Sequence, residues 1–221
     1  MSELTDLAAR ISTCTDCGLS ATRTNAVPGV GPETAEVVFV GEGPGFHEDQ
    51  QGKPFVGPSG QFLTELIRAG GMRREDVFIC NVVKCRPPNN RDPLPDEVAA
   101  CRKYLVRQVE LIQPKVVVTL GRYSLQHFLP GQSISRVHGR HTIKDGQFVM
   151  PMYHPAAALH QGSLRTVLLE DFKRLPVVVA SARAAAAQQT ISAPPLPAAP
   201  TKPMAAAAPP TPTQPEQGRL F

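Results

Sequence analysis

The chain has 221 residues, of which 42% are hydrophobic and 5% aromatic, and it carries a formal net charge of +4. This composition suffices for one ordinary domain with an appended segment, and the small positive charge permits nucleic-acid binding only through local basic patches. The N-terminus lacks the apolar stretch of a secretory signal, and no apolar run is long enough to span a membrane. We therefore expect a cytoplasmic protein without a membrane partner.

Strands and helices alternate along the first 180 or so residues of the sequence. Runs rich in Val, Ile and Phe predict strands at Glu36–Val40, Val77–Val83, Lys115–Leu120 and Phe148–Tyr153. Helical patterns cover Gly60–Ala69, Asp96–Ile112, Arg122–Phe128 and Leu164–Leu175. Thr142–Ile143 and Gln147–Val149 are candidates for a hairpin. The alternation predicts an α/β fold, namely a three-layer α/β/α sandwich around a central, mostly parallel four-stranded sheet.

The composition changes near Arg183. Residues 1–182 are expected to form the folded domain, whereas residues 183–216 are rich in Ala and Pro. Such a segment buries too little apolar surface to offset its ordering entropy, so we expect a disordered linker. The last five residues, 217–221, follow this linker as a separate short peptide.

Four of the five cysteines are candidate metal ligands. Cys14 and Cys17 form a CxxC pair, Cys85 follows the second predicted strand, and Cys101 lies on the long predicted helix. Without an export signal, metal binding is favoured over disulfides. The spacing alone leaves zinc and a four-cysteine iron–sulfur cluster both open. Cys80, in the middle of a strand, is interpreted as a small buried hydrophobe.

Polar motifs follow the first, second and last of the predicted strands. They are the turn Gly41-Glu42-Gly43-Pro44-Gly45, the segment Asn81–Pro88 and the segment His154–Ala158. Open α/β sheets bind ligands at the carboxyl ends of their strands, so these motifs are expected to meet in one site.

Together, and in this order, the cysteines and the three motifs resemble the family 4 uracil-DNA glycosylases, the iron–sulfur branch of the uracil-DNA glycosylase superfamily. The resemblance runs from about Ser12 to about Leu175. It implies a 4Fe–4S cluster on Cys14, Cys17, Cys85 and Cys101. It also implies a hydrolase that flips uracil out of DNA and cleaves its glycosidic bond, with uracil-containing DNA as its partner.

The resemblance also suggests roles in base recognition. The Asn81 amide matches the N3–H and O4 of uracil, while cytosine presents the opposite pattern. Phe55 is placed to stack on the base, and His154 to donate a hydrogen bond to O2 as negative charge develops. Backbone amides in the turn that contains Gly41 and Gly43 would approach the base closely.

Three carboxylates are available to position water, namely Glu42, Glu48 and Asp49. By resemblance, Glu48 also excludes the C5 methyl group of thymine, and Asp49 contributes to substrate binding. Family 1 enzymes have a water-activating Asp where this chain has Gly43. Which carboxylate acts on water therefore stays open at this point.

Basic and apolar residues outside the pocket are candidates for DNA contact. Arg86 and Arg91 lie in the segment between Cys85 and Cys101, and Arg136 and Arg140 form a second basic cluster. Leu159, in the expected loop 155–162, is the candidate wedge into the space vacated by the base.

The C-terminal peptide resembles the sequence that binds bacterial sliding clamps, through Gln217, Leu220 and Phe221. A chance apolar end is the alternative. For the domain itself, the alternative is a catalytically weak DNA-binding module, like the glycosylase-related domains associated with some phage polymerases. We expect a monomer in either case.

Overall fold

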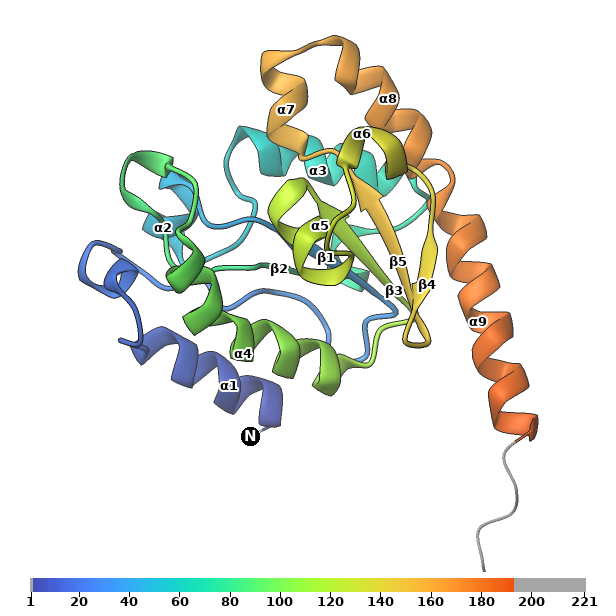
Figure 1. Ribbon diagram of the computed structural model, residues 1–221, viewed down its shortest axis with the longest axis horizontal. Coiled ribbons are helices and arrows are strands. Elements are labelled where there is room, and N and C mark those ends of the chain that lie inside the picture. Colours follow the sequence, from blue (N-terminus) through green and yellow to red (C-terminus); the bar gives the residue numbers. More distant parts are fainter. Residues whose placement is uncertain (1, 193–221) are drawn as a thin grey trace, which may run out of the picture.

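The computed structural model describes residues 2–192, which form a layered α/β fold around one sheet (Figure 1). Five strands lie in the order β2-β1-β3-β5-β4. Their bounds are β1 (Val37–Gly41), β2 (Phe78–Asn81), β3 (Val116–Leu120), β4 (Thr142–Lys144) and β5 (Gln147–Met152). All neighbouring pairs are parallel except the β4–β5 hairpin.

The predicted fold class is confirmed, but the predicted number of strands is wrong by one. The fifth strand is β4, the short partner in the expected hairpin. All three of its residues are exposed and only Ile143 is apolar, so β4 lacks the run of apolar residues that marks the other strands. β4 lies at the edge of the sheet, where a strand has a neighbour on one side only and its side chains can face solvent.

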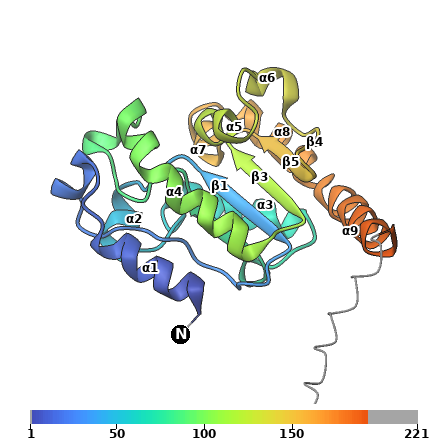
Figure 2. The ribbon, with the colours of Figure 1, turned by 60° about the horizontal axis from the view of Figure 1, so that its bottom comes forward.

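Helices cover both faces of the sheet, and Figure 2 shows α1 and α4 side by side on one of them. Alternate side chains of each strand point to opposite faces, which gives two cores. One core packs α1 and α4 against Val38, Val40 and Val117. The other packs α3, α8 and α9 against Phe39, Val118 and other strand residues. The α-helices are α1 (Glu3–Thr13), α2 (Phe46–Gln51), α3 (Pro58–Ala69), α4 (Pro95–Ile112), α5 (Arg122–Phe128), α6 (Ile134–Val137), α7 (Pro155–His160), α8 (Ser163–Phe172) and α9 (Leu175–Ser192).

The last helix extends past the expected domain boundary at residue 182. Pro176 stands at its second position, where the backbone needs no hydrogen-bond donor, so it begins α9 instead of merely ending the helix before it. Arg183 pairs with Glu36 near the start of β1, and the alanines that follow favour a helix. The rest of the expected linker and the clamp-type peptide, residues 193–221, lie outside the described residues.

The order of the strands places a binding site at one edge of the sheet. After β1 the chain passes to β2 on one side, and then crosses to β3 on the other side of β1. Such a change of direction opens a crevice at the carboxyl ends of the strands. None of the helices within residues 2–192 is long and apolar enough to cross a membrane.

Candidate active site

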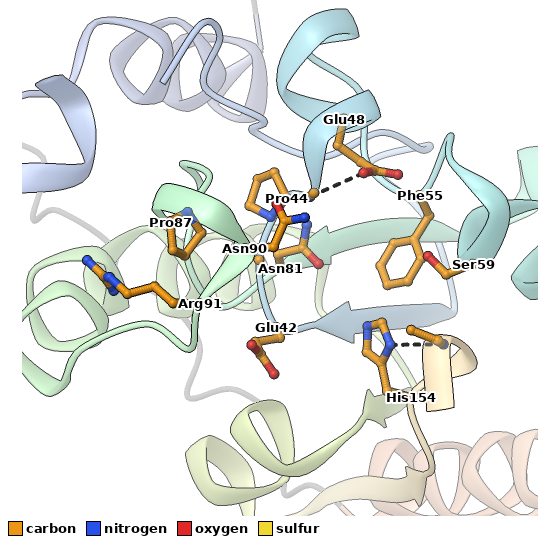
Figure 3. A pocket seen from close by; sticks show the side chains of 13 residues that line it. Glu42, Pro44, Glu48, Phe55, Ser59, Asn81, Pro87, Asn90, Arg91 and His154 are labelled. Carbon is orange, nitrogen blue, oxygen red and sulfur yellow. Dashed lines mark hydrogen bonds between the residues drawn. The ribbon is translucent and has the colours of Figure 1, made fainter. Parts of the chain in front are cut away.

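A pocket of about 330 Å³ opens at the carboxyl ends of β1, β2 and β5 (Figure 3). It brings together the motifs that follow these strands. Its lining consists of Glu42, Gly43, Pro44, Gly45, Glu48, Phe55, Ser59, Asn81, Pro87, Asn90, Arg91, His154 and Ala156. Ser59 and Asn90 belong to this lining although no motif marks them. Asn90 has a positive φ of 53°, and asparagine tolerates this conformation better than most residues.

The Phe55 ring forms one wall of the pocket. It packs against His154, with 5.7 Å between the ring centroids. A Cβ atom at Gly41 would lie 2.6 Å from Phe55 Cζ and 2.3 Å from Asn81 Oδ1. Gly41 is therefore required because both side chains press against its Cα.

Asn81 ends β2 with an unsatisfied acceptor. The residue is 1% exposed, and its Oδ1 has no hydrogen-bond partner among the described residues. A buried polar atom without a partner costs free energy, and native proteins seldom leave one. Because Asn81 lines the pocket, its Oδ1 is suited to accept a hydrogen bond from a ligand N–H.

His154 is the N-cap residue of α7 and presents a neutral imidazole. Its Nδ1 accepts a hydrogen bond from the backbone N–H of Ala156 at 3.2 Å. Burial lowers the pKa of His154 to about 4, although the charge of Glu48 opposes the shift. The ring is thus neutral at pH 7, and an accepting Nδ1 leaves its proton on Nε2. His154 can therefore donate one hydrogen bond to a ligand without carrying a charge.

Glu48 ties two loops of the pocket together. Its Oε1 accepts hydrogen bonds from the backbone N–H groups of Val56 (2.9 Å) and Gly57 (2.8 Å). Its Oε2 accepts from the N–H of Gly45 at 3.1 Å. Because both oxygens accept backbone hydrogen bonds, the Glu48 carboxylate holds the two loops that form the pocket.

Glu42 follows β1 and is the other carboxylate that lines the pocket (Figure 3). Burial raises the pKa of Glu42 to about 7, the negative charge of Asp92 adds to the shift, and Arg122 opposes it. Arg122 itself forms an ion pair with Asp92. A carboxyl group that titrates near neutral pH is suited to exchange a proton with water.

A second cavity is lined by four cysteines, Cys14, Cys17, Cys85 and Cys101. Arg23 donates to Cys85 Sγ at 2.9 Å, and the backbone N–H of Lys84 donates to Cys101 Sγ at 3.3 Å. Within residues 2–192 no group of three or more Cys, His, Asp or Glu side chains is arranged to hold a metal ion. Cys80 is buried in β2 and does not line this cavity.

Lys84 lies between the two cavities. It is 1% exposed, and its Nζ donates to the backbone carbonyl oxygen of Asn81 at 2.7 Å and to Gln108 Oε1 at 2.6 Å. Gln108 in turn donates from Nε2 to the carbonyl oxygen of Pro28 at 2.6 Å. One buried ammonium group thus connects the strand end that carries Asn81 with α4.

The pattern of the uracil DNA glycosylase superfamily matches residues 28–174 of this chain. The type-4 uracil-DNA glycosylase of Archaeoglobus fulgidus is 50% identical over 184 residues, which cover 79% of this chain and 92% of that protein. This chain belongs to the uracil-DNA glycosylase superfamily. The type-4 enzyme of Thermotoga maritima is 49% identical over 170 residues, covering 75% of this chain and 88% of that protein. A DNA polymerase of Bacillus phage SP01 is 30% identical over 148 residues, covering 66% of this chain and 16% of the polymerase.

Of the motif residues Asp49 and Gly43, both expected to bind substrate, only Gly43 lies at the pocket. Asp49 does not line the pocket; its Oδ1 accepts hydrogen bonds from the backbone N–H groups of Thr24 (2.8 Å) and Asn25 (3.3 Å). Gly43 does line the pocket, but a Cβ there would lie 2.8 Å from Val83 Cγ2. An aspartate at position 43, as in the family 1 enzymes, would require Val83 to move.

The candidate DNA-contacting residues differ in their surroundings, and only Arg91 is among the lining residues of the pocket. Arg91 lines it, but its guanidinium is paired with Glu97 at 2.6 Å. Arg86 lies over the Phe46 ring, 5.1 Å from its centroid. Arg136 and Arg140 are exposed. Leu159 is 50% exposed and lies on α7, so the segment expected to be a loop is a helix through His160.

Proposed function

We propose that this chain is a uracil-DNA glycosylase that flips uracil out of DNA and hydrolyses its N-glycosidic bond. The observation that carries this proposal is the unpaired Asn81 Oδ1 inside the pocket. Uracil N3–H is a donor that would satisfy it, while the Asn81 Nδ2 donates to uracil O4. Cytosine offers an acceptor at N3 and donors at N4, so it would leave these buried groups unpaired.

His154 stabilises the leaving base in this mechanism. When the C1′–N1 bond breaks, its electron pair goes to the uracil ring, and negative charge develops on O2. The Nε2–H of the neutral His154 is the donor for that oxygen. A preorganised donor of this kind lowers the barrier because it is stronger toward the developing anion than toward neutral uracil.

Glu42 acts on the water molecule. The water oxygen bonds to C1′, and the proton that it releases passes to the Glu42 carboxylate or to solvent. Glu42 is favoured over Glu48 because both Glu48 oxygens already accept backbone hydrogen bonds. Its pKa of about 7 leaves a large fraction ionised at neutral pH. The negative charge also favours the cationic character that develops at C1′.

Cys14, Cys17, Cys85 and Cys101 would hold a 4Fe–4S cluster. This proposal is supported by the common cavity of the four cysteines, since thiolates are the ligands that hold iron–sulfur clusters. Arg23 and Lys84 supply positive charge beside the thiolates. When bound, the cluster would fasten the segment after α1 to the chain that follows β2.

Contacts with DNA are proposed around the pocket. Arg86, Arg136 and Arg140 would bind phosphates, and Leu159 on α7 would fill the vacated stack. Gln217, Leu220 and Phe221 would bind a sliding clamp, so that the enzyme stays near newly replicated DNA.

Excision is tested with a labelled oligonucleotide that contains one uracil, incubated with the full-length protein and then treated with alkali. Cleavage at the uracil, and none in matched oligonucleotides with thymine or cytosine, is the expected result. If the protein bound the uracil-containing strand but gave no alkali-sensitive product, it would instead be a catalytically weak DNA-binding module. The similarity to a segment of the phage polymerase is the observation that favours this alternative.

A further inference from the structure

Phe55 has a strained backbone. Its φ is +53°, in the left-handed region that residues other than glycine rarely occupy. Asparagine can stabilise this conformation with its own side chain, as Asn89 and Asn90 are suited to do, but phenylalanine has no polar side-chain atom for the purpose. Contacts from elsewhere in the fold must therefore hold Phe55 in place.

Arg74, in the short helix η2 (Arg74–Asp76), makes those contacts on the carbonyl side of the loop. Its Nη2 donates to the carbonyl oxygens of Pro54 and Phe55, both at 2.9 Å. Its Nη1 donates to Thr64 Oγ1 at 3.1 Å and to the carbonyl oxygen of Gly60 at 3.4 Å. The planar guanidinium thus joins the Phe55 loop to the first turns of α3.

Glu48 holds the same loop from its amide side, through Val56 and Gly57. The carbonyl groups of residues 54 and 55 therefore accept hydrogen bonds from the Arg74 guanidinium, and the N–H groups of residues 56 and 57 donate to the Glu48 carboxylate. A Cβ at Gly60 would lie 1.9 Å from the Phe55 carbonyl oxygen, so this carbonyl is also packed tightly against α3. Together these contacts leave the Phe55 backbone little freedom to relax.

We propose that Arg74 is a positioning residue for uracil excision, because it holds the Phe55 ring where the ring stacks on the flipped base. The proposal rests on the proposed function, since base stacking is the role assigned to Phe55. Arg74 is not part of the pocket lining, so it acts through the loop and not by contact with the base.

The test compares Arg74→Met with Arg73→Met in the full-length protein. Arg73 is a matched control because it is the adjacent arginine, and its guanidinium pairs with Asp76 on the surface at 2.6 Å. We expect Arg74→Met to slow single-turnover uracil release by about 10-fold, the scale of one strained backbone conformation. Arg73→Met should retain the wild-type rate.

A double-mutant cycle with Phe55→Ala distinguishes an effect of Arg74 on the position of the Phe55 ring from a general loss of protein stability or activity. Once the ring is removed, Arg74→Met should slow the reaction further by less than about twofold. Independent, multiplicative effects of the two substitutions would overturn the proposal. Arg74→Lys should give an intermediate rate, because one ammonium group cannot reach all four acceptors. If Arg74→Met does not fold, the same cycle is made with Arg74→Lys.

The two proposals fail in different ways. A wild-type protein that releases no uracil would contradict the proposed function. A wild-type protein that is active, together with equal rates for the Arg74 and Arg73 variants, would contradict the role of Arg74 alone.

Discussion

Asn81 and His154 offer complementary hydrogen-bonding atoms to the same small pocket. Asn81 brings a free acceptor oxygen, and His154 brings an Nε2–H whose tautomer is set by the Ala156 amide. Neither side chain carries a charge at neutral pH. Under the proposed function, the pocket would select a base by its pattern of donors and acceptors, and it would stabilise that base most as negative charge develops on it.

Replacing either residue by alanine should slow uracil release. We expect His154→Ala and Asn81→Ala each to lower the single-turnover rate on a U·G duplex by about 10²-fold or more, the scale of a lost transition-state donor. Rates within about threefold of wild type would contradict the assigned roles. Thermal unfolding of both variants serves as the control, because side chains at a pocket wall should matter less for folding.

The reaction should depend on pH through Glu42. Its pKa of about 7 means that the carboxyl group is protonated below neutral pH and cannot accept a proton from water. We expect kcat to rise with pH through about 7 and then to level off. Glu42→Gln should be slow and should lose this rise. If wild type and Glu42→Gln showed the same rise, the titrating group would be another one. Since the pKa of His154 is about 4, its titration does not contribute to the change of kcat with pH near neutrality.

At the residue scale, the sequence alone predicted which side chains converge but not all of their contacts. Asn81 and His154 stand at strand ends, Phe55 lies between α2 and α3, and the topology brings all three to one pocket. The three backbone hydrogen bonds of Glu48 depend on loop geometry, which no local pattern encodes. For the same reason, no local pattern indicated that Asp49 turns away from the pocket.

The start of α3 determines the position of the Phe55 loop. Because a Cβ at Gly60 would lie 1.9 Å from the Phe55 carbonyl oxygen, Gly60→Ala must displace the loop or the helix. We expect a loss of about 1–3 kcal/mol in the free energy of unfolding, measured with urea, together with slower uracil release. Gly162→Ala is the matched control, since a Cβ there has no neighbour within 4 Å. Equal stability of the two variants would contradict this packing argument.

The cysteine cavity joins elements that are distant in the sequence. We expect anaerobically prepared protein to contain iron and acid-labile sulfide, and Cys101→Ser to lose most of both. Cys80→Ser is the control and should retain its iron, because Cys80 lies in β2 away from the cavity. Stoichiometric zinc without iron in the wild-type protein would contradict the assignment of an iron–sulfur cluster.

The apolar strands and most of the predicted helices agree with the structure, whereas the 11-residue helix α1 and the short helices α2, α6 and α7 were not predicted. The cores of β1, β2, β3 and β5, and the helices α3, α4 and α5, agree with their sequence patterns to within a few residues. The short helices α2, α6 and α7 are stabilised by caps and tertiary contacts more than by an apolar period. α9 continues past the expected boundary because alanine favours a helix even where little is buried.

At the scale of the whole molecule, the sequence continues past the described residues to the clamp-type peptide, residues 217–221. We expect deletion of residues 217–221 to abolish binding to the sliding clamp in a calorimetric titration, because Leu220 and Phe221 are the apolar anchors. Excision of uracil from short oligonucleotides should be unchanged, since the pocket lies entirely within residues 42–156. Equal clamp binding by truncated and full-length protein would contradict the role of the tail.

The buried Lys84–Gln108 contact restricts how this sequence can evolve. Replacing Lys84 alone would leave Gln108 Oε1 and the Asn81 carbonyl without their donor, and replacing Gln108 alone would remove one of the acceptors of a buried ammonium group. Two apolar side chains introduced together would avoid both costs, but that path needs two substitutions at once. Each single step passes through a less stable protein. Natural drift should therefore retain or exchange the two residues as a pair, although neither of them lines the uracil pocket.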